Sequence, residues 1–214
     1  MFYETSTNNH GLPRDPFKAL ITQRPIGWIS TVSRDGICNI APYSFFNAIG
    51  EKPHYVIFGS GGVKDSVRNI EETGEFVCSL STYALRGEMN VSSALVPDVV
   101  DEFPIAGLTA TNSQMVAPPR VKESPAAFEC KHWKTIELPA AEPGGPGGYQ
   151  AVIGLVVGVD IDDAALKDGF FDTAGVEPLA RLGYMDYARV TKDTAFTLER
   201  PVVEADGSVT SPKL

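Results

Sequence analysis

Ser60 to Ser66 is the stretch whose residue types and spacing best suit the binding of a phosphate group. It reads SGGVKDS, so glycines, hydroxyls and the Lys64 ammonium stand where a helix is expected to begin. The free backbone N–H groups and positive dipole end of a helix start attract anions, and glycine permits close approach. An ordinary turn capped by Asp65 or Ser66 accounts for the same residues, because such caps occur in any fold. The polar and charged residues of this candidate stretch are Ser60, Lys64, Asp65 and Ser66.

The same glycine-rich stretch matches neither of two familiar nucleotide motifs. Gly59 to Lys64 ends in lysine where the dinucleotide fingerprint needs a small residue, and it lacks the four-residue spacer of a P-loop. Rossmann-type and ATP-binding interpretations are therefore disfavoured.

Ala41 to Asn47 (APYSFFN) is the second candidate stretch, because it can hold a flat heteroaromatic ring. Its aromatic side chains would lie against the ring, and a hydroxyl and an amide would meet the polar edge. Core packing is the alternative, since most paired aromatic residues fill protein interiors. The candidate ring contacts are Ser44, Phe45, Phe46 and Asn47.

A β-hairpin is expected to carry this aromatic stretch. Gly27 to Ser33 is rich in β-branched and aromatic residues, and Asp35-Gly36 is a strong turn signal before a returning strand, Ile37 to Asn47. The first strand brings further hydroxyl groups to the same hairpin, although a strand former and a turn residue explain them equally well. They are Ser30, Thr31 and Ser33.

The remaining pattern predicts many short strands and few helices. Val63, Val67 and Ile70 have helical spacing, and Gly74 is a suitable C-cap for a helix from about Val63 to Thr73. Such a series favours a single mainly β domain, a barrel, over a doubly wound sheet. The other expected segments are strands His54 to Phe58, Glu75 to Ser81, Ala126 to Leu138 and Gln150 to Asp162, a helical turn over Thr82 to Asn90, a long loop over 91–125, a flexible hairpin tip over Glu142 to Gly148, and a tail of about ten residues.

Composition restricts the partners of the chain. A net charge of -9 over 214 residues argues against nucleic acid, whose phosphates need surplus Lys and Arg. Three cysteines without CxxC spacing favour reduced thiols and a cytoplasmic protein. No export signal or membrane segment is expected, and the separation of His10, His54 and His132 argues against a metal site.

Several blocks, taken in order, resemble the flavin reductase-like family, nearest its branch of nitrilotriacetate monooxygenase component B and flavoredoxin-like proteins. The resemblance covers most of the chain, and the ordered series is far more specific than any single block. The blocks are RPIGWISTVSRDG (Arg24 to Gly36), NIAPYSFFN (Asn39 to Asn47), KDSVRNIEETGEFVCSL (Lys64 to Leu80), DEFPIAGLT (Asp101 to Thr109), PPRVKESPAAFEC (Pro118 to Cys130) and PLARLGYMDYA (Pro178 to Ala188).

The resemblance implies an FMN-binding split β-barrel of Greek-key type and a homodimer. It places Ser30, Thr31 and Ser33, together with Ser60, Lys64, Asp65 and Ser66, on the FMN phosphate and ribityl chain. It places Ser44 to Asn47 on the isoalloxazine. It also places Arg181, Tyr184 and Tyr187 towards the open, substrate side of the flavin. NADH or NADPH would be the electron donor, and free flavin or a partner monooxygenase the acceptor. A non-catalytic flavin-binding electron carrier and a split-barrel oxidase of phosphorylated substrates are the alternatives.

One strand departs from the family pattern. Relatives commonly carry Glu and His where this chain has Leu155 and Asp160. If this strand lies beside the flavin, the exchange of an imidazole for a carboxylate would weaken acceptance of an anionic nicotinamide cofactor. FMN binding is not affected by this departure.

Overall fold

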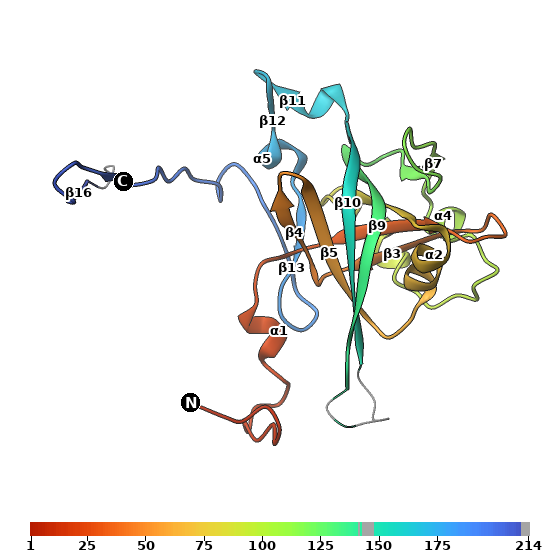
Figure 1. Ribbon diagram of the computed structural model, residues 1–214, viewed down its shortest axis with the longest axis horizontal. Coiled ribbons are helices and arrows are strands. Elements are labelled where there is room, and N and C mark those ends of the chain that lie inside the picture. The colour runs from red at the N-terminus through yellow and green to blue at the C-terminus, as the bar shows by residue number, and fades with distance from the viewer. Residues whose placement is uncertain (141, 143–147, 211–214) are drawn as a thin grey trace.

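The computed structural model describes residues 1–140, 142 and 148–210 (Figure 1). Of the expected flexible tip, Glu142 to Gly148, residues 143–147 lie outside the described part, as do residues 211–214 of the expected tail. The expected mainly β architecture with short helices is confirmed. The described tail runs away from the body of the molecule and ends in a small hairpin (Figure 1).

Seven antiparallel strands form the main sheet in the order β3-β2-β6-β9-β10-β5-β4. The sheet does not close into a continuous barrel, because β3 and β4 are its two edges. It is strongly curled nevertheless, since a Cβ on Gly27 of β2 would lie 2.5 Å from the Phe46 ring on β4. The strands of this sheet are β2 (Gly27–Val32), β3 (Cys38–Tyr43), β4 (Phe46–Glu51), β5 (His54–Gly61), β6 (Glu75–Leu80), β9 (Ala126–Leu138) and β10 (Tyr149–Ile161).

The expected hairpin forms between β2 and β3, but its second strand is shorter than predicted. Pairing ends at Tyr43 opposite Gly27, and the chain then crosses to the other edge of the sheet. Phe46 and Asn47 belong to β4, where they lie opposite Phe58 and Ile57 of β5. The aromatic stretch therefore spans the open side of the sheet rather than lying on one strand.

Apolar side chains cover both faces of β2. Ile29 packs into a core with Phe58, Phe76 and Val152, which the helix α2 (Asp65–Thr73) closes from one side. Trp28 points to the opposite core, beneath α3 (Arg86–Val91) and α4 (Glu102–Ile105), and its Nε1–H donates to Ser92 Oγ at 2.9 Å. This alternation follows from the period of two in a strand, and it anchors the segment after Ser92 against the sheet.

The helices differ from the prediction at their boundaries. Helix α2 begins at Asp65 rather than near Val63, because Lys64 is extended, and Val63 is exposed. The predicted loop over 91–125 also contains regular structure. The helices are α1 (Phe17–Leu20), α2 (Asp65–Thr73), α3 (Arg86–Val91), α4 (Glu102–Ile105), the 3-10 turn η1 (Asp163–Ala165) and α5 (Thr173–Val176). The short strands are β1 (Arg24–Pro25), β7 (Ala110–Thr111), β8 (Arg120–Val121), β11 (Leu166–Lys167), β12 (Phe170–Phe171), β13 (Leu179–Arg181), β14 (Tyr187–Arg189), β15 (Val202–Val203) and β16 (Val209–Thr210).

Gly74 ends α2 in the left-handed region, as its predicted C-cap role requires, with φ of 78° and an N–H that donates to Ile70 O. We expect Gly74→Ala to lower the free energy of unfolding by about 1 kcal/mol, because alanine is strained at positive φ. No atom lies within 4 Å of the added methyl, so a steric clash does not contribute. Urea unfolding measures the change. Gly87→Ala in α3 is the matched control, where an equally free methyl should stabilise by about 0.5 kcal/mol.

Candidate functional site

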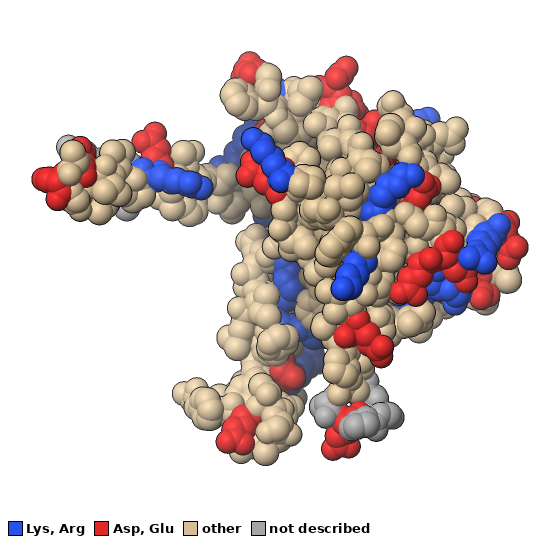
Figure 2. Space-filling model, viewed as in Figure 1, with Lys and Arg blue, Asp and Glu red and all other residues tan. Residues whose placement is uncertain are grey.

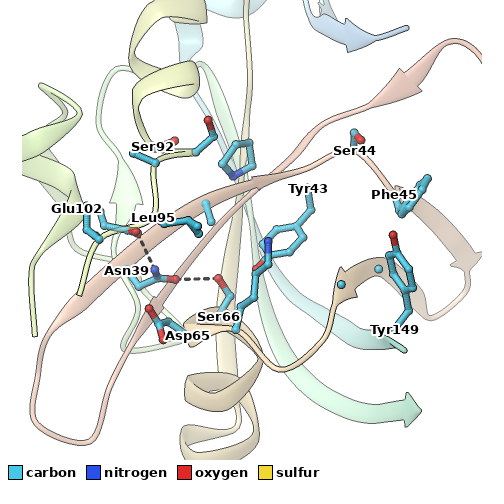
Figure 3. A pocket seen from close by; sticks show the side chains of 18 residues that line it. Asn39, Tyr43, Ser44, Phe45, Asp65, Ser66, Ser92, Leu95, Glu102 and Tyr149 are labelled. Atoms are coloured by element: carbon cyan, nitrogen blue, oxygen red, sulfur yellow. Dashed lines mark hydrogen bonds between the residues drawn. The ribbon is translucent and has the colours of Figure 1, made fainter. Parts of the chain in front are cut away.

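A cavity of about 460 Å³ lies where the start of α2 meets the ends of β3 and β5 and the segment 92–96 (Figure 3). Both predicted candidate stretches contribute to it, although they are separated in sequence. From the first come Lys64, Asp65 and Ser66, and from the second Ser44 and Phe45. The structure therefore joins the expected phosphate end and the expected ring end in one hollow.

The start of α2 leaves backbone donors free at this cavity. Lys64 is the N-cap residue, yet no side chain accepts a hydrogen bond from the first turn. The opening N–H groups of a helix have no partner within the helix, so they and the dipole favour an anion. Lys64 adds a positive charge at the same place.

Tyr43 supplies a further donor. Its hydroxyl is buried and has no hydrogen-bond partner among the described residues, while its side chain lines the cavity. The Tyr43 hydroxyl approaches those of Ser60 and Ser66 without a well-formed hydrogen bond, and these two donate their own protons to Gly62 O and Asn39 Oδ1. Burial raises the pKa of Tyr43, so the hydroxyl keeps its proton. An unpaired buried donor is costly, which favours a ligand oxygen at this place.

A buried polar network forms the floor of the cavity (Figure 3). Glu102 Oε2 accepts hydrogen bonds from Asn39 Nδ2 and from the Ile40 N–H, both at 2.6 Å. Asn39 Oδ1 in turn accepts from Ser66 Oγ at 2.8 Å. Burial raises the pKa of Glu102 to about 7, and the nearby Asp65 and Asp101 carboxylates act in the same direction. Glu102 therefore titrates near neutral pH inside the cavity.

The sequence interpretation did not single out Asn39 or Glu102. Both stand in quoted blocks, NIAPYSFFN and DEFPIAGLT, but nothing in their local pattern marks them as cavity residues. They meet only because α4 packs on β3, which no local signal predicts.

The other end of the cavity is aromatic. Phe45 and Tyr149 meet edge to face with ring centroids 5.9 Å apart. The Gly59 N–H donates to Phe45 O at 2.7 Å, and a Cβ on Gly59 would lie 3.2 Å from the Phe45 Cβ. Glycine thus permits the close approach of β5 to the crossing segment. Beyond this pair a second cavity of about 800 Å³ is lined by Phe46 and Asn47.

A third cavity, of about 310 Å³, contains the residues expected on the substrate side. Arg181, Tyr184 and Tyr187 line it together, with Arg181 4.3 Å from the Tyr187 ring centroid. Ser44 lines all three cavities, so they adjoin one another around this residue.

Four predicted contacts lie away from the cavities. Ser30 is fully buried and donates to Pro119 O, and Thr31 is fully buried beside Asn39 and Asn69. Ser33 accepts the Ile37 N–H in the hairpin turn. Ser60 donates to Gly62 O. Each of these four hydroxyls is bonded within the folded chain, as the Ser66 hydroxyl in the cavity also is.

Leu155 and Asp160 also lie outside the three cavities. Asp160 forms an ion pair with Arg120, which also approaches Glu129 at 3.7 Å. Leu155 is opposite Tyr55 and Lys131 in the sheet. At Asp160 the departure from the family pattern therefore supplies an ion pair, and neither residue lines the three cavities.

Within the described residues, no cluster of three or more His, Cys, Asp or Glu side chains is arranged to hold a metal ion. None of the described helices has the length and apolar character that crossing a membrane requires.

The fold and the joined cavities define a mainly β protein that offers an anion cradle beside an aromatic shelf. The family model of the flavin reductase like domain matches residues 21–187, and the chain belongs to this family. It is 34% identical over 191 residues to an uncharacterized protein of Halalkalibacterium halodurans, covering 86% of this chain and 88% of that one.

Solved structures agree with this family. Nitrilotriacetate monooxygenase component B from Bacillus cereus superimposes with a TM-score of 0.80 at 29% identity, covering 92% of this chain and 98% of that one. A protein with a split barrel domain from Shewanella frigidimarina superimposes with a TM-score of 0.75 at 23% identity, covering 94% of this chain and 98% of that one. The resemblance seen in the sequence blocks is thus confirmed.

Proposed function

We propose that this protein is an FMN-dependent oxidoreductase that passes electrons from NADH or NADPH to free flavin, a partner monooxygenase or another acceptor. The observation that carries the proposal is the juxtaposition of an uncapped helix start with an aromatic shelf in adjoining cavities. Family membership supports the flavin chemistry. In this proposal the curled open sheet is the split barrel, which the Shewanella frigidimarina structure supports.

The residues present fit FMN as a ligand. Lys64, the first N–H groups of α2 and the Tyr43 hydroxyl would hold the phosphate, because all are donors without a partner from the described chain. Phe45 and Phe46 would line the isoalloxazine, with Ser44 and Asn47 at its polar edge. The cavity volumes lie in the range of roughly 300 to 1,000 Å³ that is usual for such ligands.

The protein's contribution is binding, orientation and access. When bound, the flavin would supply the redox chemistry by accepting a hydride and passing its electrons on. The chain has to fix the phosphate at α2, exclude water from one ring face with its aromatic side chains, and leave the other open. The cavity with Arg181 and Tyr187 lies on that accessible side in this proposal.

A second copy of the chain is part of the proposal. An apolar cavity lined by Phe46, Phe128, Val159 and Phe171 opens where β9 begins and β10 ends, at the opposite end from the hairpin tip. Phe128 and Val159 are 38% and 54% exposed, which is unfavourable unless a partner covers them. We propose a cytoplasmic homodimer, in which the three free cysteines remain reduced.

The visible spectrum of the purified protein, with and without added FMN, tests cofactor binding. We expect a yellow protein with one FMN per chain, and a colourless protein at saturating FMN would contradict the proposal. Anaerobic stopped-flow mixing with NADH and NADPH then separates the activities. Rapid bleaching supports the reductase, whereas a lasting oxidised spectrum favours a non-catalytic electron carrier that lacks a nicotinamide site. Turnover without a nicotinamide donor would favour the oxidase alternative.

A further inference from the structure

The third cavity carries an unbalanced positive charge. Lys18, Arg24 and Arg181 line it, and no acidic residue is among the described residues that do. This is unexpected in a protein with a net charge of -9. Figure 2 shows Lys and Arg atoms in the recess between the N-terminal segment and the body of the molecule. We call the cavity lined by Lys18, Arg24 and Arg181 the cationic cavity.

The two arginines face each other across a strand pair. Arg24 of β1 lies opposite Arg181 of β13 in register, and like charges at directly opposed positions destabilise a sheet. No described carboxylate pairs with Arg24 or Arg181, a feature that they share with the arginines at positions 14, 86 and 200, whereas Arg34, Arg68, Arg120 and Arg189 each have one. Burial and the charge of Arg181 lower the pKa of Arg24. The fold therefore maintains two adjacent uncompensated charges.

Arg24 is held in place from the protein side. One of its terminal nitrogens donates to Lys18 O and Ile21 O, and the other to Leu182 O at 2.8 Å. The buried Nε–H of Arg24 nevertheless has no hydrogen-bond acceptor among the described residues. The residue is only 6% exposed. A buried charged donor without an acceptor is costly, and a ligand oxyanion would remove that cost.

Arg181 is fixed beside it. Its guanidinium donates to Tyr184 O and stacks on the Tyr187 ring, which limits its motion. Tyr184 holds a positive φ of 56°, which is uncommon for a bulky residue and is often found at functional positions. The cavity also presents apolar surface from Ile26, Met89 and the tyrosine rings, beside the polar groups of Ser44, Asn90 and Ser93, and so can take a flat body with one anionic group.

We propose that the cationic cavity binds the carboxylate or phosphate group of a small aromatic substrate, beside the flavin site. This inference rests on the proposed function only where it identifies the ligand as a redox substrate. The binding of an anion in the cationic cavity does not depend on the proposed function. Because Ser44 is common to this cavity and to the two assigned to the flavin, a bound aromatic ring would lie next to the isoalloxazine.

Calorimetric titration of the protein with benzoate, phenyl phosphate and benzamide, with and without FMN, tests the inference. Either anion should bind at least about tenfold more tightly than neutral benzamide, as expected for one charge-assisted hydrogen bond. The better of the two anions identifies the carboxylate or phosphate source. Equal binding of all three ligands would overturn the proposal.

Variants locate the binding. Arg181→Gln should lower the affinity for the preferred anion about tenfold. Arg181→Lys should retain much of the affinity, because it keeps the charge. Arg189→Gln is the matched control, since Arg189 lines a different cavity and pairs with Glu177. An unchanged affinity in Arg181→Gln, or an equal loss in Arg189→Gln, would contradict the assignment.

The titrations also separate this inference from the proposed function. If the protein binds no FMN, anion binding to the protein alone still tests the cationic cavity. If FMN displaces the anion competitively, the cavity holds the flavin phosphate and the proposal of a separate substrate site is wrong. Binding of the anion to the FMN-loaded protein, with a shift in the flavin spectrum, supports it.

Discussion

Lys64→Ala is expected to weaken FMN binding by about 1 to 3 kcal/mol, which corresponds to roughly a fivefold to more than a hundredfold rise in Kd. The physical reason is the loss of the one cationic side chain among the described residues that line the cavity at the start of α2. The remaining donors, which are backbone N–H groups and the Tyr43 hydroxyl, hold a phosphate less strongly without that charge. Fluorescence titration with FMN measures the change.

Riboflavin is the matched ligand control for this variant, because it lacks the phosphate. Its affinity should be nearly the same for the wild type and Lys64→Ala. Lys167→Ala, on the short strand β11 and away from the cavities, controls for the loss of one surface charge. Unchanged FMN affinity in Lys64→Ala would remove Lys64 from the phosphate site.

Glu102→Gln is expected to change how stability depends on pH. The pKa of Glu102 is raised to about 7 in the folded protein, so the folded state binds this proton more tightly than the unfolded chain. Its contribution to stability is therefore complete at acidic pH and is lost as pH rises from about 4.5 to 7. The full loss is about 3 kcal/mol. Glutamine stays neutral, so the variant escapes this loss.

Urea unfolding of the apoprotein between pH 4.5 and 8 measures this effect. The stability of Glu102→Gln relative to wild type should increase with pH across this window and level off above about pH 7.5. Glu71→Gln, which removes one exposed carboxylate from α2, controls for the change in net charge. A constant difference between wild type and Glu102→Gln at every pH would show that Glu102 is not the titrating group.

The same carboxyl should affect flavin binding. An ionised Glu102 places a negative charge in the cavity that would receive the phosphate, so FMN affinity is expected to fall as pH rises past 7. The wild type should show this fall, and Glu102→Gln should show less of it. Riboflavin binding should change little, which separates charge repulsion from a loss of structure.

Local residue patterns predict two stretches that line the site, but they do not predict every residue that lines it. The glycines and Lys64 before α2, and the aromatic stretch after β3, were recognisable because turn chemistry and strand alternation are local properties. Asn39 and Glu102 were missed because they meet only through the packing of α4 on β3. Conversely, Ser30 and Thr31 were included as candidate contacts, yet their hydroxyls are bonded in the interior. Whether a hydroxyl faces a cavity is decided by packing.

Local patterns and the ordered blocks predict the mainly β class, the hairpin across Asp35-Gly36, the short helix ended by Gly74 and the family. Each of these depends on neighbours within a few residues or on an ordered series of blocks. Two features follow from the folded arrangement instead: the chain crosses the open sheet at Ser44, and Arg24 and Arg181 face each other with no described carboxylate between them. Those features arise from contacts between distant segments, so their energies depend on the whole fold and no local pattern encodes them.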